Sequence, residues 1–381
     1  MAFYQRSMKV LLTLLFLGVF AQGRNIAKHQ LKLVSINGIP EITIALPDGS
    51  EDSLHLKHAI DESICAYRGH LRNDPKACVA VTGCPGQDPL EITIAGKTGG
   101  LFKLGLDGIT EDSTNADPRE DPIGDGGEDH DIDENMSKPM PPIPDGPRDR
   151  DAVADKFWSQ MPSTMLLRIK PHYDESALAW KGGDHEKVKR YIQYALTHAQ
   201  VPYCHASLGV KVKLALAAGE PVYHQGVTWN PSTAMQQAYD YDAETDLHWY
   251  LSYSPGANPG GKAFALGVVC NPAYKLKGNQ MSMFGFDDDK WTGQIMAHEI
   301  GHALGMGHDV EVNPLNDYEN KLATNHLKRG CTFKGQMSYI TNGKYPPLEW
   351  SICSSTDFHY YYDYIKWYYG WCLKEAPDAC Q

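Results

Sequence analysis

Three histidines in the C-terminal half of the chain have the spacing of metal ligands. Residues 298–309 read H-E-I-G-H-A-L-G-M-G-H-D. His298 and His302 are four residues apart, so a helix places them on one face, one turn apart. Gly305 can leave the helix in a left-handed conformation, which lets His308 turn back as a third ligand. Three histidines leave the fourth position of a tetrahedral Zn²⁺ open for water, as in catalytic zinc sites.

Glu299 follows the first histidine and would project beside the metal. A carboxylate at this position can accept a proton from the water that zinc activates. We therefore expect one Zn²⁺ with Glu299 as its catalytic base. Asp287, Asp288 and Asp289 suggest a Ca²⁺ site only weakly, because further oxygen ligands in register are lacking and acidic loops are usually just solvated. The other histidines singled out have no ligand spacing and are interpreted as ordinary residues: His185, His198, His224 and His248.

The N-terminus has the features of a secretory signal over residues 1–23. Arg6 and Lys9 precede a short apolar run at 10–20, and small residues follow at 21–23. This run is too short for a membrane span, and no later segment is long and apolar enough. Nine cysteines fit an oxidising compartment, and their odd number leaves at least one unpaired or paired between chains. We expect a secreted, extracellular, monomeric protein.

The 381 residues suffice for two domains, and composition marks a boundary between them. Residues 24–106 contain strand-like runs at 31–36, 41–46 and 91–95 and predict a small β-rich domain. Residues 107–155 are rich in Asp, Glu, Pro and Gly and predict an exposed linker that a protease can cut, with a glycosylation sequon at Asn135. The net charge of −12 argues against nucleic acid and anionic membranes as partners.

Residues 156–381 return to a globular composition and predict a catalytic domain. Strands are expected at 164–170, 210–216, 247–251 and 262–269, and a helix is expected at 185–200. The segment 291–304 predicts the helix that carries the first two histidines. A last helix at 358–371 is rich in Tyr and Trp, which we interpret as packing residues.

The chain resembles a metzincin of the reprolysin or adamalysin branch, which includes ADAM-type and snake-venom metalloproteases. Asp309 directly after the third histidine is typical of this branch. Residues 335–339 (G-Q-M-S-Y) resemble the Met-turn, although Gly-Gln stands where Cys-Ile is common. Similar family segments occur at 261–272 and 350–354, and residues 65–84 resemble part of the family's propeptide. The resemblance covers most of the chain.

This resemblance implies an α/β (α+β metzincin) fold. It has a twisted, mostly parallel sheet with an antiparallel edge strand, a long metal-binding helix, a Met-turn and a C-terminal helix, preceded by a small β-rich prodomain. Met337 would form an apolar floor under the histidines. An edge strand with Gly261, Lys262 and Ala263 would hold a peptide substrate through main-chain hydrogen bonds. Tyr339 would line the site as a wall residue or, as in astacins, reach the metal.

Cysteine roles also follow from the resemblance. It implies bridges Cys65–Cys84, Cys331–Cys353 and Cys270–Cys372, which leaves Cys204–Cys380, while the sequence alone leaves many pairings open. Cys78 lies in P-K-A-C-V, which resembles the cysteine switch of the family's propeptides. A thiolate could occupy the open zinc position. The alternatives are a buried free cysteine and a bridge partner.

The main functional interpretation is a secreted zinc endopeptidase made as a zymogen and acting on proteins or peptides. The alternative is a catalytically weak or inactive secreted binding protein on a metzincin scaffold. The intact ligand set and Glu299 favour the enzyme. A zinc hydrolase acting on non-peptides is a third interpretation, which the expected edge strand disfavours.

Overall fold

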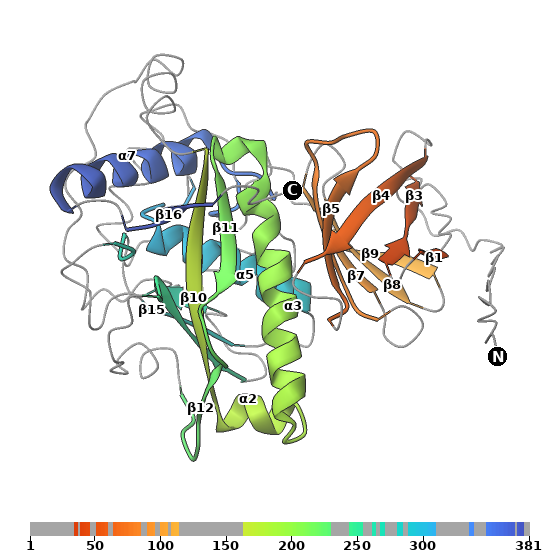
Figure 1. Ribbon diagram of the computed structural model, residues 1–381, viewed down its shortest axis with the longest axis horizontal. Helices are drawn as coiled ribbons and strands as arrows, with labels where there is room; N and C mark the ends of the chain where they lie inside the picture. Colours follow the sequence, from red (N-terminus) through yellow and green to blue (C-terminus); the bar gives the residue numbers. More distant parts are fainter. Residues whose placement is uncertain are drawn as a thin grey trace, which may run out of the picture.

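The computed structural model describes sixteen stretches of the chain, and every structural statement below concerns these residues. They are 34–36, 39–45, 51–59, 64–84, 90–95, 100–105, 108–113, 163–229, 244–253, 261–263, 267–270, 280–284, 289–309, 335–338, 348–369 and 372–376. They form a β-sheet unit from the first third of the chain and a larger α/β unit from the remainder, side by side (Figure 1).

The β-sheet unit is a seven-stranded antiparallel sheet in the order of the sequence. Its strands are β3 (Thr43–Ala45), β4 (Glu51–His58), β5 (Ala66–Leu71), β6 (Cys78–Thr82), β7 (Leu90–Ala95), β8 (Gly100–Gly105) and β9 (Gly108–Ser113). A separate hairpin joins β1 (Val34–Ile36) to β2 (Ile39–Glu41). Alternate apolar residues such as Val79, Val81, Ile92 and Ile94 fill one core, as the period of a strand requires. The strand-like runs expected at 41–46 and 91–95 contribute β3 and β7 to this sheet, and β9 lies beyond residue 106.

The α/β unit is built on a mixed sheet in the order β11-β10-β13-β15-β14. The strands are β10 (Thr164–Asp174), β11 (Lys211–Leu216), β13 (Leu247–Ser252), β14 (Gly261–Ala263) and β15 (Gln280–Phe284). The pairs among the first four are parallel, and β14 runs antiparallel to β15 at the edge. Short strands β12 (Val222–His224) and β16 (Lys374–Glu375) also pair with β10. This arrangement confirms the predicted fold class.

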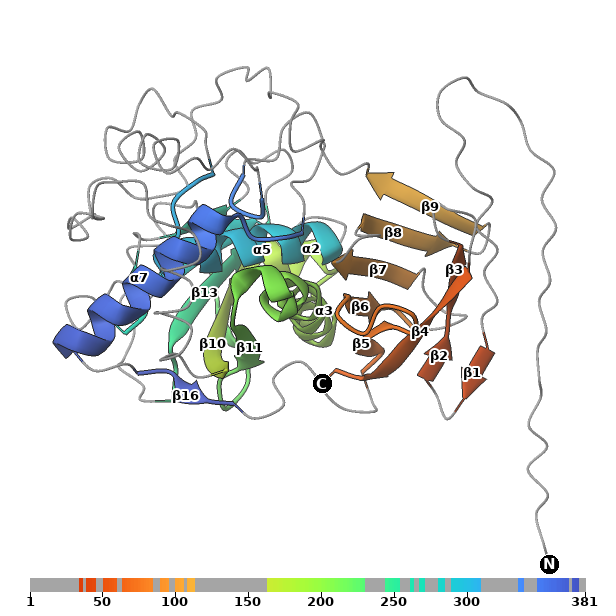
Figure 2. The ribbon, with the colours of Figure 1, turned by 90° about the horizontal axis from the view of Figure 1, so that it is seen from above.

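Two long helices, α3 (His185–Cys204) and α5 (Asp289–Ala303), cross the sheet and pack against each other (Figures 1 and 2). Asp184 caps α3 by accepting hydrogen bonds from the amides of Glu186 and Lys187, which satisfies the free donors of its first turn. The buried stripe of α3 lies in the core with the apolar face of the sheet. Gly293 lets the helices approach closely, because a Cβ there would lie 2.5 Å from the Cβ of His198.

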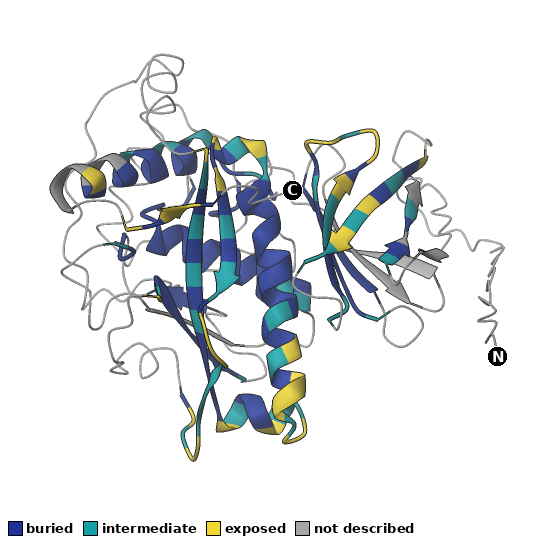
Figure 3. Cartoon of the chain, in the orientation of Figure 1, coloured by how far each residue is buried: buried dark blue, intermediate teal, exposed yellow. Residues whose placement is uncertain are grey.

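The remaining helices are short or terminal. Helix α2 (Glu175–Trp180) and the single turn η2 (Ala206–Leu208) flank α3, and α7 (Ile352–Tyr369) lies near the C-terminus. The C-terminal half of α3 is buried, and so is α5 except for Asp289 and Trp291 (Figure 3). No helix among the described residues is long and apolar enough to cross a membrane.

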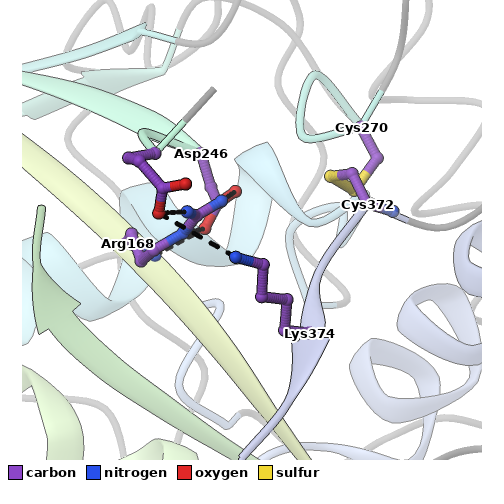
Figure 4. Close-up of polar contacts among 6 residues, drawn as sticks. Arg168, Asp246, Cys270, Cys372 and Lys374 are labelled. Atoms are coloured by element: carbon purple, nitrogen blue, oxygen red, sulfur yellow. Dashed lines mark hydrogen bonds and ion pairs between the residues drawn. A yellow bond between two sulfur atoms is a disulfide. The ribbon is translucent and has the colours of Figure 1, made fainter. Parts of the chain in front are cut away.

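A disulfide and an ion pair between Lys374 and Glu244 fasten the C-terminal segment, and Arg168 and Asp246 join β10 to the start of β13 (Figure 4). Arg168 on β10 forms a bidentate pair with Asp246, at 3.0 Å from Nε and 2.8 Å from Nη2. The Cys270–Cys372 bridge holds the segment just before β16, close to where β16 pairs with β10. Cys65–Cys84 closes the ends of β5 and β6. Cys204 and Cys353 are also disulfide-bonded, but their predicted partners Cys380 and Cys331 lie outside the described residues.

Candidate active site

The three predicted ligands meet at the C-terminal end of α5. His298 and His302 lie one turn apart on the helix, and their ring planes are nearly perpendicular. The Nε2 atom of His308 lies 3.1 Å from the Nε2 atom of each of them. They form the one cluster of metal-binding side chains found among the described residues.

Main-chain carbonyls fix the orientation of two of these rings. His298 donates from Nδ1 to the carbonyl oxygen of Gln336 at 3.1 Å, and His302 donates from Nδ1 to that of Met306 at 2.8 Å. A neutral imidazole that donates from Nδ1 carries a lone pair on Nε2. Two such lone pairs converge on one point together with the Nε2 atom of His308. Nitrogen lone pairs this close repel one another unless a cation lies between them. Three imidazole ligands suit Zn²⁺, so the residues fit the predicted metal.

Gly305 makes the turn that brings His308 back to the helix. Its φ of 93° is in the left-handed region, and a Cβ there would lie 2.7 Å from Tyr361. The amides of residues 267–269 donate to the carbonyls of His302 and Ala303 at the end of the helix. Residues 267–269 therefore cap α5, and the prediction of a strand was wrong over these three residues. Their amides bond to the end of α5 and not to a neighbouring strand.

Met337 packs against α5 at Gly301, between the two helical histidines. It is fully buried, and a Cβ on Gly301, between the two helical ligands, would lie 2.4 Å from its Sδ atom. The preceding Gln336 accepts the bond from His298 and donates from its side chain to the carbonyl of Gln294, at 3.1 Å. Gln336 is one of the two residues that differ from the common Cys-Ile. It links the turn to α5 by two hydrogen bonds, one through its main chain and one through its side chain. Tyr339 lies outside the described residues.

Glu299 lies between the helix and the edge strand. It is 1% exposed, and a Cβ on Gly261 of β14 would lie 2.6 Å from its Oε1 atom. Tyr203 lies nearby: burial, and then the charge of Glu299, raises the pKa of Tyr203 well above its usual value. The neutral Tyr203 hydroxyl donates to the carbonyl of Ala297 at 2.8 Å. Helix α5 thus presents a carboxylate beside both the ligand set and the strand expected to bind substrate.

Comparison with known families agrees with this geometry. Residues 182–355 match the family described as Metallo-peptidase family M12B, Reprolysin-like. This stretch is a reprolysin-like metallopeptidase domain. It contains the three histidines, Glu299 and Met337. No curated protein matched the chain.

Asp309 organises the metallopeptidase domain behind the third ligand, a role that sequence reasoning did not assign to it. Its Oδ1 atom accepts hydrogen bonds from the hydroxyls of Ser351 and Ser354, the latter at 2.8 Å. Its Oδ2 atom accepts from the amide of Gly335 at 2.9 Å. The main chain of Asp309 also bonds to Met337. One buried carboxylate thus joins the ligand segment, the Met-turn and the start of α7.

We expect Asp309→Asn to destabilise the metallopeptidase domain by about 2 kcal/mol and to weaken zinc binding by about 10- to 100-fold. The amide NH₂ of the new side chain would face one of the hydrogen-bond donors that the carboxylate accepts from, so a bond would be lost. The segment that carries His308 would then be held less firmly. The matched control is Asp184→Asn, at the partly exposed N-cap of α3, which should leave zinc affinity unchanged. Urea unfolding and competition with a zinc-binding dye measure both quantities. Equal zinc affinity in the two variants would contradict the role of Asp309.

We expect Gly261→Ala to lower kcat by one to two orders of magnitude, as about 1 Å of displacement of a catalytic group does. The new methyl group would press on Glu299 and Ile295. Since none of the histidines is contacted there, zinc content should stay at one per chain. Peptide hydrolysis and elemental analysis on the same preparation test this. An unchanged kcat would show that β14 does not constrain Glu299.

Cys78 does not lie at the histidines in this structure. It is on β6, packed against the cluster of Ala80, Ala95, Val201 and Leu348, and is the free cysteine among the described residues. Burial raises the pKa of its thiol to about 12, which disfavours the thiolate that would bind zinc. This position does not support a thiol switch. Of the acidic run expected as a weak Ca²⁺ site, Asp289 begins α5, and Asp287 and Asp288 lie outside the described residues.

Two of the histidines interpreted as scattered belong to a second buried group. His172 on β10 contacts His224 through Nδ1 at 3.1 Å and His248 through Nε2 at 2.9 Å. Burial lowers the pKa of His172 to about 2. These contacts leave from opposite sides of one ring and do not converge on a point as the ligands do. The group is therefore a hydrogen-bonded chain across three strands, and only the fold brings it together.

Proposed function

We propose that the chain is a secreted zinc endopeptidase, made as a zymogen and cleaving extracellular proteins. The observation that carries this proposal is the convergence of three histidine Nε2 atoms next to a buried Glu299 that abuts an edge strand. A binding protein that had lost activity would need none of these features together. The match to a metallopeptidase family supports the same activity.

Each part of the site has a role in peptide hydrolysis. His298, His302 and His308 would hold the zinc, which supplies a Lewis acid for the scissile carbonyl and for a water molecule. Glu299 accepts a proton from the attacking water and passes it to the nitrogen of the leaving amine. Strand β14 pairs with β15 through one edge only within the described sheet. Its other edge offers main-chain groups to an extended peptide, by β-augmentation.

The activity is tested by cleavage of casein and of a peptide library, with and without 1,10-phenanthroline. We expect cleavage within the chain of the substrate, loss of cleavage with the chelator and recovery when zinc is added. A preparation that contains one zinc per chain and cleaves neither substrate would instead establish the inactive binding protein.

Latency and processing form the second half of this proposal. The acidic segment that follows β9 and reaches residue 155 separates the β-rich domain from the metallopeptidase domain, and Arg148 and Arg150 are its most basic positions. N-terminal sequencing of the secreted form should find a mature chain that begins between about residues 107 and 156, because the composition of this segment exposes the backbone to proteases. A secreted chain that begins at Arg24 would contradict processing.

A further inference from the structure

The β-sheet unit rests on the metallopeptidase domain through a second buried face. On β6 and β7 the side chains of one face fill the core of the unit, while those of the other face meet α3 and the start of α5. The sheet lies beside these two helices in Figures 1 and 2. All six residues of β7 are therefore buried. A strand with alternating Ile and Thr normally exposes its polar face to water. Here the polar face is covered by protein.

Small apolar residues form one part of this contact. Ala80 and Ala95 of the sheet pack with Val201 of α3 and with Leu348, and all four are buried. The partly buried side chains of Cys78 and Trp291 pack against this cluster. The contact with α5 is at its N-terminal end, where the amide of Lys290 donates to Glu91 of β7 at 3.2 Å. Lys290 precedes His298 by about 12 Å along the helix at 1.5 Å per residue, so this contact is distant from the ligands.

His198 of α3 lies at the centre of the polar part of the contact. Its Nε2 atom is 2.8 Å from the hydroxyl of Thr82 on β6, and its Nδ1 atom is 2.8 Å from that of Thr93 on β7. The ring is fully buried. Both nitrogens are thus bonded to the β-sheet unit, and separation of the two parts would return the ring to water. Among the described residues, His198 is the histidine whose two ring nitrogens both bond across this contact.

The surroundings of His198 oppose a positive charge on its ring. Lys290 of α5 is fully buried and acts on the ring through its charge. Arg68 of β5 reaches the same contact and donates to Gln200 of α3 at 3.4 Å. Glu91 of β7 bonds at the start of α5, and the neutral thiol of Cys78 lies on β6. Burial first, and then Lys290, lowers the pKa of His198 to about 3.

We propose that the β-sheet unit remains bound to the metallopeptidase domain after the linker is cut, and that protonation of His198 in mildly acidic surroundings releases it. The buried contact is continuous and needs no covalent link. Threonine hydroxyls can accept bonds from a charged ring, so the penalty on protonation comes first from burying the charge of the ring and then from the nearby charge of Lys290. This inference rests on the proposed processing of a zymogen, but its test measures binding and no catalysis, so each can fail separately.

Linkage gives the size and direction of the effect. His198 takes up a proton below pH 6.5 when it is in water, and it stays neutral to about pH 3 when the unit is bound. Binding is therefore at full strength above pH 6.5 and weakens as the pH falls. The dissociation constant should rise about 10-fold between pH 7.5 and 5.5, and about 30-fold between pH 7.5 and 5.0.

The experiment uses the full chain with a site for a specific protease placed within residues 114–155. The chain is immobilised through a C-terminal tag, cut, and washed at pH 7.5, 6.5, 5.5 and 5.0 while the bound mass is recorded. Rebinding of the released unit gives the dissociation constant. Near-UV circular dichroism on the same samples limits the measurement to pH values at which both parts stay folded. We expect the unit to stay bound at pH 7.5 and to leave in acid.

Two matched variants separate His198 from other buried histidines. His198→Gln can still bond both threonines but does not titrate, so its dissociation constant should change less than 3-fold over the same range, a limit set well below the loss that one titrating group causes. His359→Gln replaces a buried histidine of α7 that bonds to Leu208. It should keep the full acid release. Equal pH dependence in wild type and His198→Gln, or loss of the unit already at pH 7.5, would overturn the inference.

Discussion

Glu299→Gln should keep one zinc per chain and lose about two to four orders of magnitude in kcat. The three histidines are untouched, so the metal stays. The amide has the shape of the carboxylate, and it fits the space beside Gly261 where even a methyl group would crowd Oε1. An amide cannot accept the proton of the attacking water at neutral pH. Chemistry is therefore lost while binding of metal and substrate remains.

The measurement is hydrolysis of a quenched peptide, with metal content determined on the same sample. Glu186→Gln is the matched control, because Glu186 is an exposed residue of α3 in an ion pair with Lys189. Such a surface pair contributes little, about 0–1 kcal/mol, so this variant should have wild-type turnover. If Glu299→Gln kept turnover within 10-fold of wild type, Glu299 would not be the base.

Local patterns explain why the ligand set could be predicted from the sequence. A four-residue spacing on a helix and a glycine that ends the helix are properties of a short stretch of chain, and they place His298, His302 and His308 with little help from the fold. The parallel sheet was expected through the family resemblance. Strand β15 was missed although it lies between β13 and β14, since Q-M-S-M-F is short and has no β-branched residue, although its polar and apolar residues alternate.

Longer-range features could not be predicted because their partners are far apart in sequence. Asp309 bonds to residues from 335 to 354, and His172 meets His224 and His248 only when three strands pair. Helix α7 begins at Ile352, ahead of the predicted 358, because Ser351 accepts a bond from the amide of Ser354 and caps it. The alternating Ile and Thr of β7 predicted a strand correctly. The burial of its polar face could not be predicted, because α3 covers that face only in the folded chain.

His308→Ala should remove the zinc almost completely at micromolar metal, with activity lost as a consequence. Its Nε2 atom lies 3.1 Å from each of the other two ligand atoms, so its loss leaves two imidazoles and an open side. Loss of an outer partner of a ligand costs about 10- to 100-fold in metal affinity, and loss of a ligand costs more. The variant should also lose the stabilisation by zinc, which is about 4 kcal/mol when the metal is at 1,000 times its dissociation constant.

Elemental analysis and thermal unfolding with and without added zinc distinguish this effect from general damage. Wild type should show a melting temperature that rises with zinc, and His308→Ala should show none of that rise. The control is His185→Ala, in the exposed first turn of α3, where the ring bonds to Tyr173 at 2.6 Å. It should bind zinc as wild type does, because its ring is not part of the ligand cluster. Equal zinc content in the two variants would show that His308 is not a zinc ligand. The turn at Gly305 would then serve the fold and not the binding of metal.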